Sequence, residues 1–491
     1  MSNNYLAVDL GAESGRTIVG SLDGDRLSLD ETHRFINNAV RLPDGLHWDV
    51  LRLWSDIKTG IAISSTKFNN QLTSIGLDTW GVDFALLDKH DALLSNPFHY
   101  RDVRTDGMVD EAFKRITREE IFAYTGIQFL QINTLYQLLA MSAQKSPLLD
   151  LAQTFVTIPD LFNFWLSGQI TNEFTNATTT QCLDPNDKTW SKPILAAMDI
   201  PNHLFRPVIE PGTVIGSLLP TIAEEIGVAQ VPIVAPACHD TGSAVVAVPA
   251  QNQNFAWISS GTWSILGAEV LQPSLSGKTL KYNFTNEGGV FGTWRLSKNI
   301  MGLWLLQESR REWKRAGEEL SYEIMTRLAE ESEAFVAVVD PDFSEFLHPG
   351  DMPTRIQKFC AETGQRVPQT KGQIIRVALE SIALKYRWVL ERLEEIIGYR
   401  LDPIHIIGGG IKNGLLNQFT ANSTGRLVVA GPVEATAIGN ILMQAISLNH
   451  LGSLPEARSI VQTSFKPIEY EPTDGSLWDE AYLRFLKVMK E

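Results

Sequence analysis

Apolar and polar positions alternate along the chain in short apolar runs and in longer amphipathic segments. The stretch LTSIGLDTWGVDFALLD (72–88) has the short apolar runs of strands, whereas GQIIRVALESIALKYRWVLERLEEIIG (372–398) repeats apolar residues at helical spacing. Gly398 and Pro403 are expected to end this helix, because glycine favours a helix C-terminus and proline cannot continue a helix. Strands mixed with amphipathic helices predict an α/β fold.

Two similar segments lie about half a chain apart. Residues 6–20, LAVDLGAESGRTIVG, combine an apolar strand, a turn of small and polar residues, and a second apolar strand, and residues 255–267, FAWISSGTWSILG, do the same. We predict a β-hairpin at each. A turn of Gly, Ser and Thr exposes the N–H and hydroxyl donors that a phosphate chain needs. A single hairpin is equally explained as a plain strand connection, but the pair favours two phosphate-binding tips that face each other.

Three charged residues accompany the first hairpin. Asp9 is placed where an acidic side chain at the edge of a phosphate site holds Mg²⁺, directly or through water, although an Asp at a strand end also caps turns. Arg16 is a natural neighbour of phosphate. Glu13 would repel phosphate and is therefore expected to point away.

The segment VPIVAPACHDTGSAVVAVPA (231–250) predicts a buried strand followed by a tightly packed helix. Asp240 then falls at the helix N-terminus, where the helix dipole favours its ionised form and suits it to act as a general base. The same position suits an ordinary N-cap. His239 is either a hydrogen-bond donor to substrate or a satisfied core histidine, and its place beside Asp240 favours the first interpretation.

A third glycine cluster lies in IHIIGGGIKNGLLNQFTANSTG (404–425), which predicts a strand, the glycines 408–410 and a helix whose N-terminus admits a nucleotide. The spacing G-x-G-x-x-x-G and the position near the C-terminus disfavour a dinucleotide-binding dehydrogenase. The sequence contains no GxxxxGK[ST], HExxH or paired-cysteine metal motif.

Length and charge narrow the class of protein. A chain of 491 residues with 44% hydrophobic residues predicts two sizeable domains, which we place at residues 1–246 and 247–491, with a hinge near residue 246. A formal net charge of −15 without a basic block argues against nucleic acid. The absence of a signal-like or membrane-spanning segment predicts a cytoplasmic protein that does not bind membranes. The three cysteines are widely spaced and are expected to be reduced thiols.

These motifs together resemble the FGGY family of carbohydrate kinases. The resemblance extends over nearly the whole chain through VDLGAESGR, LDTWGVDFALLD, CHDTGSAVVAVP, SSGTWSILG, NEGG, KNIMGLWLLQE, HIIGGGIKNGLLNQ and GPVEATAIGNILMQA, in this order. It implies two actin-like (ribonuclease H-like) domains with a catalytic cleft between them, and ATP-dependent phosphorylation of a ketose. The last helix is expected to pack back on the first domain.

Within the family, the enzymes that act on L-rhamnulose are the most similar, which implies phosphorylation of its 1-hydroxyl in rhamnose catabolism. L-fuculose and xylulose are alternative substrates. An actin-like nucleotide-binding regulator without sugar chemistry is a further alternative. The stretches CHDTG and TWGVDF disfavour it, because a nucleotide switch needs neither a sugar pocket nor a base aimed at an alcohol.

The resemblance also implies roles for individual residues. Asp240 is the expected proton acceptor, and the sugar is expected to be held by Gly81, His239, Asp240, Thr241 and Asn299. ATP is expected to contact Ala12, Glu13, Ser14, Gly15, Arg16, Thr262, Gln307, Gly409 and Gly410, with Mg²⁺ at Asp9.

Simpler interpretations are a turn glycine for Gly81, an N-cap for Asn299 and a solvated helix face for Gln307. Glu13 departs from the family, which often has a small hydroxyl residue there, and one phosphate contact is expected to be weaker. The partners are a ketose and ATP, and the protein is expected to be a monomer or a homodimer.

Overall fold

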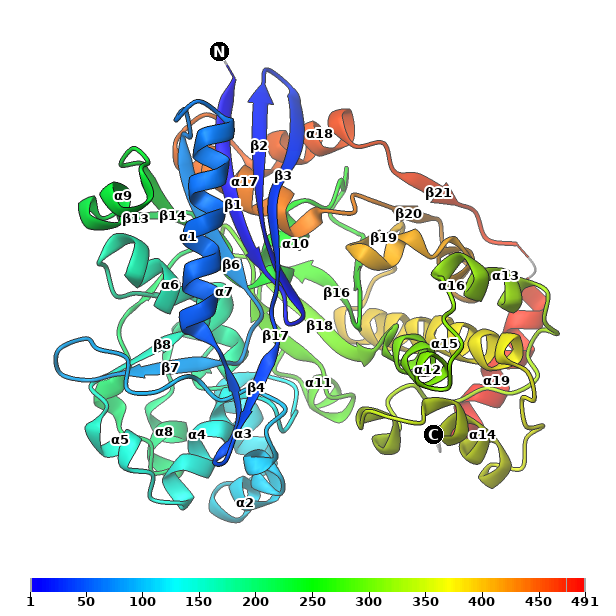
Figure 1. Cartoon of the computed structure of the whole chain (residues 1–491). Coiled ribbons are helices and arrows are strands. Elements are labelled where there is room, and N and C mark those ends of the chain that lie inside the picture. Colours follow the sequence, from blue (N-terminus) through cyan, green and yellow to red (C-terminus); the bar gives the residue numbers. More distant parts are fainter. Residues whose placement is uncertain (1, 474, 490–491) are drawn as a thin grey trace. The chain divides into compact units, whose positions relative to one another are not determined.

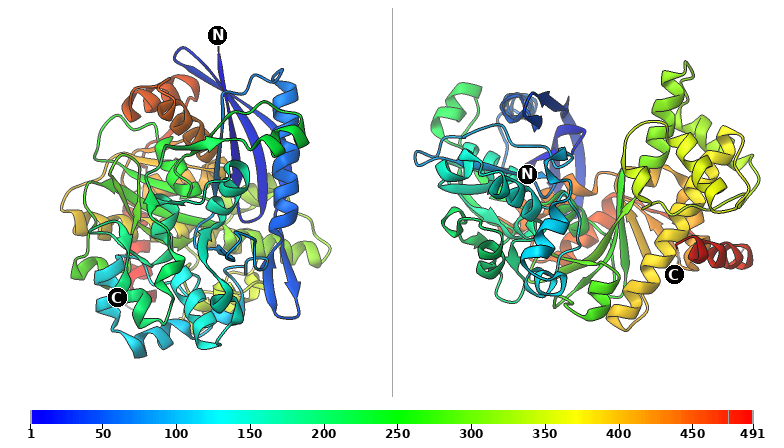
Figure 2. Two further views of the ribbon diagram at one scale, coloured as in Figure 1. Left: turned by 90° about the vertical axis from the view of Figure 1, so that its left-hand side faces the viewer. Right: turned by 90° about the horizontal axis from the view of Figure 1, so that it is seen from below.

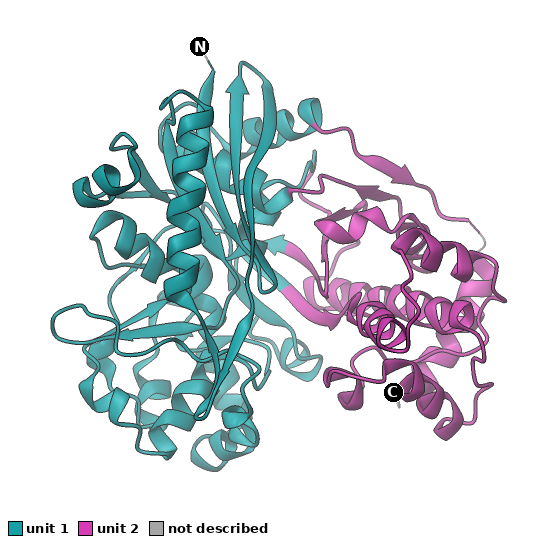
Figure 3. Cartoon of the chain, in the orientation of Figure 1, with its two compact units in different colours: residues 1–251, 269–296, 435–464 teal, residues 252–268, 297–434, 465–491 magenta. Residues whose placement is uncertain are grey.

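The computed structural model describes residues 2–473 and 475–489 (Figure 1). Its internal contacts divide the chain into two units (Figure 3). Unit 1 comprises residues 1–251, 269–296 and 435–464, and unit 2 comprises residues 252–268, 297–434 and 465–491. In contrast to a single division after residue 246, two segments from the second half of the sequence therefore belong to unit 1.

Unit 1 is built on a six-stranded sheet in the order β13-β14-β6-β1-β2-β3. The first three strands form an antiparallel meander, β6 runs parallel to β1, β14 runs parallel to β6, and β13 is antiparallel to β14. The strands are β1 (Asn3–Leu10), β2 (Ser14–Asp23), β3 (Arg26–Ile36), β6 (Ser74–Thr79), β13 (Thr213–Ser217) and β14 (Pro232–Ala235).

Helices cover both faces of this sheet. Helix α1 (Val50–Lys67) packs on β1, β2 and β3 from one face, while α17 (Ala435–Ser447) packs on β1 and β6 from the other, with α10 (Asp240–Val246) beside it (Figure 1; Figure 2). Close approach requires glycines in the strands: a Cβ at Gly20 would lie 2.6 Å from Ile441 of α17. α17 follows the third glycine cluster by sequence, yet it completes the core of unit 1.

The rest of unit 1 consists of short strand pairs and helices around a second buried core, centred on residues such as Phe155, Leu138 and Trp294. The strand pairs are β4 (Ala39–Leu42) with β5 (Gly45–Trp48), β7 (Phe84–Leu87) with β8 (Thr154–Thr157), β9 (Asn172–Glu173) with β12 (Val208–Ile209), and β10 (Leu183–Asp184) with β11 (Thr189–Trp190). The helices are α2 (Met108–Arg115), α3 (Arg118–Thr125), α4 (Thr134–Ala143), α5 (Pro147–Leu151), α6 (Ile158–Ser167), α7 (Phe174–Ala177), α8 (Lys192–Ala197), α9 (Pro220–Ile226), α11 (Gly277–Lys281) and α18 (Leu454–Ser464), with 3₁₀ turns at Val103–Thr105, Thr178–Thr180 and Asn202–Leu204.

The second large sheet has seven strands in the order β17-β18-β16-β15-β19-β20-β21. β15 and β16 are antiparallel, β19 runs parallel to β15, and β20 runs parallel to β19. This order repeats that of the first sheet, with β15, β16, β18, β19 and β20 in the places of β1, β2, β3, β6 and β14. The strands are β15 (Ala256–Ser260), β16 (Trp263–Val270), β17 (Thr285–Gly288), β18 (Trp294–Met301), β19 (Ile404–Ile407), β20 (Val428–Ala430) and β21 (Ile468–Tyr470).

The amphipathic segment near residue 380 forms the 27-residue helix α15 (Lys371–Ile397), as its periodicity predicts. Thr370 and Gln373 form a capping box at its start, and Gly398 ends it in the left-handed conformation (φ 85°). The last helix, α19 (Gly475–Val488), packs on α15 and α16 within unit 2, whereas the late segment that belongs to unit 1 is 435–464. The other helices of unit 2 are α12 (Trp304–Arg315), α13 (Tyr322–Glu330), α14 (Met352–Glu362) and α16 (Gly414–Thr424), with 3₁₀ turns at Ser344–Leu347 and Gly409–Lys412.

Candidate active site

The first predicted hairpin is present, with β1 and β2 joined by a tight turn. Its register sets Asp9 opposite Arg16, and Nε and Nη2 of Arg16 donate to Oδ2 of Asp9 at 2.9 and 2.7 Å. Arg16, expected beside phosphate, is thus paired with the expected Mg²⁺ ligand. Glu13 is solvent-exposed at the tip. Asn37 supports the turn, because its backbone N–H donates to the carbonyl of Glu13 (3.1 Å) and its Nδ2 to that of Gly11 (2.8 Å).

The remaining residues of this tip differ in their surroundings. Ala12 and Ser14 are partly exposed, whereas Gly15 is buried. A Cβ at Gly15 would lie 2.3 Å from the ring of Phe35 on β3. Packing of the neighbouring strand therefore accounts for the absence of a side chain at Gly15.

A second carboxylate, Asp78, lies beside Asp9 because β6 runs parallel to β1 and pairs the two residues in register. Asp78 is fully buried, and its Oδ2 accepts a hydrogen bond from Nδ2 of Asn440 on α17 at 2.6 Å. Among the residues that the structure describes, its Oδ1 has no hydrogen-bond partner. Burial and the charge of Asp9 raise the pKa of Asp78 well above its usual value. The sequence analysis did not select Asp78, although it stands at a strand end in LDTWG.

The amide of Asn440 belongs to a buried chain of side chains between α17 and the sheet. The hydroxyl of Ser74 donates to Oε1 of Gln444 (2.6 Å), and Nε2 of Gln444 donates to Oδ1 of Asn440 (2.7 Å). A Cβ at Gly76 would lie 2.3 Å from Asn440 Oδ1, so this strand position admits only glycine beside the amides. The chain fixes the Asn440 donor toward Asp78, 362 residues away in sequence.

Asp240 is the first residue of α10, and His239 occupies the N-cap position. The carboxylate of Asp240 accepts hydrogen bonds from the backbone N–H and the hydroxyl of the next residue, Thr241. It therefore does not cap the helix, and the N-cap interpretation is wrong. Its side chain keeps 31% exposure, so solvent reaches the carboxylate. Burial raises the pKa of Asp240, His239 opposes the rise, and the charge of Asp9 adds to it.

The backbone that carries His239 and Asp240 is held by a buried carboxyl group, Glu173. Its Oε1 accepts from Thr175 N (2.9 Å), and its Oε2 accepts from the Thr175 hydroxyl (2.7 Å), Asn176 N (3.1 Å) and Cys238 N (3.1 Å). The Thr175 hydroxyl also accepts from the backbone N–H of His239 at 3.1 Å. Burial raises the pKa of Glu173 to about 8, against the effect of these donors. Glu173 thus links α7 to the start of α10.

The motif TWGVDF forms the loop after β6. Thr79 donates its N–H to the carbonyl of Cys238 at 2.9 Å, which places the loop beside the start of α10. Gly81 is restricted, because a Cβ there would lie 3.0 Å from Thr179. The backbone conformation that is unusual for its residue type belongs to Val82, at φ 68°, where a β-branched residue is strained. Both of its backbone groups are bonded: its N–H donates to Oγ1 of Thr179 (3.0 Å), and its carbonyl accepts from Oγ1 of Thr134 (2.6 Å).

The second predicted hairpin is also present, with β15 and β16 antiparallel and Thr262 at the turn. The start of α12 is attached to this turn, since Leu303 N donates to the carbonyl of Gly261 (3.0 Å) and Trp304 N to that of Thr262 (3.2 Å). Gln307 lies in the first turn of α12, and its Oε1 is buried without a hydrogen-bond partner among the described residues. The solvated-face interpretation of Gln307 is therefore wrong.

Asn299 lies inside strand β18, and Leu303 is the N-cap of the following helix, so the N-cap interpretation of Asn299 is also wrong. The third glycine cluster follows β19, as predicted. Gly408 has φ 86°, which favours glycine. A Cβ at Gly410 would lie 2.0 Å from Oγ of Ser260 on β15, whereas one at Gly409 would meet nothing within 4 Å. Gly410 is required for packing within unit 2, and the surface above Gly409 is open.

Comparison with known proteins identifies the family of these two units. Residues 4–247 match the N-terminal domain, and residues 256–448 the C-terminal domain, of the FGGY family of carbohydrate kinases. The chain belongs to this family. The resemblance seen in the motifs is thereby confirmed, and the FGGY fold and its sugar-kinase class apply to this protein, with ATP as the family's co-substrate.

Curated relatives cover nearly the whole chain. A rhamnulokinase of Bacteroides thetaiotaomicron is 41% identical over 99% of both chains, and a rhamnulokinase of Oceanobacillus iheyensis is 42% identical over 96% of this chain and 98% of its own. Among solved structures, a gluconate kinase from Lactobacillus acidophilus aligns with TM-score 0.83 at 15% identity, covering 100% of this chain and 98% of its own. A xylulose kinase from the same organism aligns with TM-score 0.82 at 16% identity, over 99% and 98%. These structures show that the FGGY fold is shared.

Each unit brings together a separate set of the expected residues. The hairpin tip, Asp9, Gly81, His239, Asp240 and Thr241 belong to unit 1, whereas Thr262, Asn299, Gln307, Gly409 and Gly410 belong to unit 2. Within residues 2–473 and 475–489, no three His, Cys, Asp or Glu side chains converge as a metal-binding group. In the same described part of the chain, no helix is long and apolar enough to cross a membrane. The three cysteines are buried free thiols, as expected.

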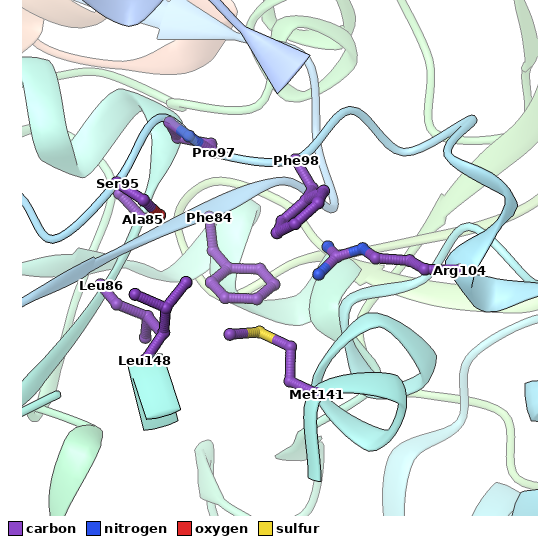
Figure 4. Close-up of a pocket in the computed structure, with 9 residues that line it drawn as sticks. All are labelled: Phe84, Ala85, Leu86, Ser95, Pro97, Phe98, Arg104, Met141 and Leu148. Carbon is purple, nitrogen blue, oxygen red and sulfur yellow. The ribbon is translucent and has the colours of Figure 1, made fainter. Parts of the chain in front are cut away.

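A small pocket lies elsewhere in unit 1, between β7 and the segment 95–104 (Figure 4). Figure 4 shows the guanidinium of Arg104 among the side chains of Phe84, Phe98 and Met141. Its Nη2 donates to Oε1 of Gln137 at 2.7 Å. None of the nine lining residues belongs to the expected sugar or nucleotide sites. The pocket therefore supports the fold around the TWGVDF loop and is not assigned a ligand.

Proposed function

We propose that this protein transfers the γ-phosphoryl group of ATP to the 1-hydroxyl of L-rhamnulose, giving L-rhamnulose 1-phosphate and ADP in rhamnose catabolism. Curated relatives that are 38–42% identical over at least 95% of this chain are rhamnulokinases, which favours this ketose. L-fuculose and xylulose are the alternatives, because a single changed contact to a hydroxyl is enough to change specificity.

The observation that carries the proposal is the position of Asp240. A solvent-accessible carboxylate at the start of α10, with a pKa raised by burial, is suited to take a proton from an alcohol. In the reaction, Asp240 accepts the proton of O1 as O1 forms a bond to the γ-phosphorus. The bond from that phosphorus to the β,γ-bridging oxygen breaks, and ADP leaves with the electron pair.

The other residues bind and orient the reactants. In unit 1, Gly81, His239 and Thr241 are proposed to hold the sugar, and Ala12 to Arg16 to contact the phosphates. In unit 2, Asn299 is proposed to bind the sugar. Thr262 is proposed to donate to phosphate, with Gln307, Gly409 and Gly410 toward the nucleotide. The buried, unpartnered Oε1 of Gln307 supports this role, since such an atom gains a hydrogen bond when a donor binds.

The carboxylates of unit 1 fit a Mg²⁺ that is bound mainly by phosphates and water, because Mg²⁺ commonly takes one or two carboxylates from the protein. Asp9 is the proposed ligand, and the unpartnered Oδ1 of Asp78 beside it supports a cation at this edge of the sheet. When bound, Mg²⁺ neutralises charge on the transferring phosphoryl group. The chain's contribution is to hold the two carboxylates in register and to keep Arg16 on Asp9.

Two measurements test the proposal. ADP release with ATP and a panel of L-rhamnulose, L-fuculose and xylulose is expected to show the highest kcat/KM for L-rhamnulose, and a higher value for another ketose would replace it as the substrate. Asp240→Asn is expected to lower kcat by about 10²–10⁴-fold while ADP still binds, as loss of a general base predicts. Near-normal turnover by this variant would exclude Asp240 as the proton acceptor.

A further inference from the structure

His239 lies in a buried cluster that the proposed reaction does not by itself explain. Its Nε2 faces Oδ1 of Asp240 at 3.3 Å. Its Nδ1 lies 3.0 Å from Nη2 of Arg295 on β18 and 3.3 Å from Oε2 of Glu287 on β17. Arg295 and Glu287 are themselves 3.1 Å apart. All four residues belong to unit 1.

We propose that Arg295 is a positioning residue that fixes the tautomer of His239, so that Nδ1 accepts from Arg295 and Nε2–H is donated to Asp240. This inference rests on the proposed role of Asp240 as the proton acceptor. It assigns Arg295 and Glu287, neither of which was selected from the sequence, to the support of the reaction. The motif NEGG, which contains Glu287, thereby gains a physical purpose.

The donors and acceptors around the ring permit one neutral arrangement. A guanidinium only donates, so the nitrogen it faces must offer a lone pair. A carboxylate only accepts, so the nitrogen facing Asp240 must carry the proton. With the proton on Nδ1 instead, that nitrogen would oppose Arg295, and a lone pair on Nε2 would oppose the carboxylate of Asp240. Two unfavourable contacts would replace two favourable ones.

Burial and further contacts make the arrangement rigid. The side chain of Arg295 is 1% exposed and that of Glu287 is 8% exposed, so both are withdrawn from water. Arg295 also donates Nε to the carbonyl of Gly288 at 2.8 Å, which orients the guanidinium plane. Although burial alone would raise it, Arg295 and His239 hold the pKa of Glu287 below its usual value. Glu287 therefore stays ionised and balances the charge of Arg295.

Glu287 also explains what the loss of Arg295 would do. The charged groups facing His239 are Asp240 on α10, Glu287 on β17 and Arg295 on β18, and the charges of Glu173 and Glu269 act on Arg295. Without the guanidinium, two carboxylates would face the ring from opposite sides. His239 would then gain a second proton at neutral pH and would pair with Asp240 as an imidazolium. That ion pair would weaken Asp240 as a base, because a positive neighbour lowers the proton affinity of a carboxylate.

The tautomer itself is measured without any substrate. In ¹⁵N-labelled protein, the His239 ring signals are assigned by comparison with His239→Asn, and each ring nitrogen that carries a proton is distinguished by its chemical shift. We expect a neutral ring with the proton on Nε2 and no titration of His239 between pH 6 and 8. A proton on Nδ1 in the wild-type protein would overturn the proposal. This result is independent of which sugar is phosphorylated.

Kinetics of matched variants test the functional consequence. Arg295→Met removes the donor and the charge, and is expected to lower kcat by about 10²-fold and to add an ionisation of His239 to the acidic limb of the kcat profile. Arg295→Gln keeps a side-chain N–H for Nδ1 and is expected to recover at least tenfold of this loss. KM for ATP is expected to stay within twofold in both. Equal kcat values and pH profiles for the two variants would show that Arg295 acts only in packing.

Discussion

Glu173 offers the sharpest test of how the fold holds the start of α10. Glu173→Ala removes the acceptor of four hydrogen bonds, three of them from the backbone N–H groups of Thr175, Asn176 and Cys238. Each buried N–H left without a partner costs about 1–3 kcal/mol. Water entering the space left by the side chain recovers part of this, so we expect a total loss of about 3–5 kcal/mol in the free energy of unfolding.

Glu173→Gln is the matched control. Its carbonyl oxygen can take the place of Oε2 and keep three of the four donors, while its amide faces Thr175 N and loses one hydrogen bond. The expected cost is about 1–2 kcal/mol. Urea unfolding measures both values, and kcat is expected to fall more in the alanine variant, because the backbone of His239 loses its support. A cost below 1 kcal/mol for Glu173→Ala would refute the reasoning that this carboxyl group clamps the segment.

The remaining predictions concern other parts of the two units. Gly409→Val is expected to weaken ADP binding without changing the melting temperature, whereas Gly410→Val is expected to lower the melting temperature, because its Cβ would collide with β15; calorimetry and thermal unfolding separate the two. Val82→Gly is expected to change the free energy of unfolding by less than about 1 kcal/mol, because relief of left-handed strain offsets lost side-chain contacts, and urea unfolding checks this value. Asn440→Leu is expected to cost about 1.5–3 kcal/mol, by loss of the donor to Asp78. Since the folded-state pKa of Asp78 is already raised, ionisation destabilises the fold as pH rises, and this deficit should grow with pH in thermal unfolding; a constant deficit would contradict it.

Local patterns predicted the elements that depend on local sequence. Both hairpins, the helix ended by Gly398 and the strand before the glycines 408–410 are present as the sequence indicated. Their signals are turn residues, periodicity and caps within a few positions. The position of Asp240 at the start of a helix was predicted as well, although its side chain does not cap that helix.

Contacts made by topology could not be predicted in the same way. The pairing of Asp78 with Asp9 requires knowing that β6 lies parallel to β1, and the bond from Asn440 requires a helix 362 residues away in sequence. Arg295 and Glu287 reach His239 from two further strands. An acidic residue at the end of a buried apolar run, as in LDTWG, was the one local signal that pointed to Asp78.

The duplicated sheets show how one architecture acquired two kinds of edge. In unit 1, β1, β6 and β14 run parallel, so their carboxyl ends meet at one edge, which carries Asp9, Asp78 and, after β14, Asp240. The charge gathered there raises the pKa values of Asp78 and Asp240 and makes the edge suited to a cation and to a proton acceptor.

The corresponding strands of unit 2, β15, β19 and β20, are followed or ended by Ser260, Gly408 and Gly431. Small residues at the same topological positions give an edge without charge, at which backbone groups can approach a nucleotide closely. The two halves of a phosphoryl transfer place opposite demands on a protein, because a proton acceptor needs negative charge and a polyphosphate is repelled by it. A duplicated sheet meets both demands by changing only the residues at the ends of its parallel strands.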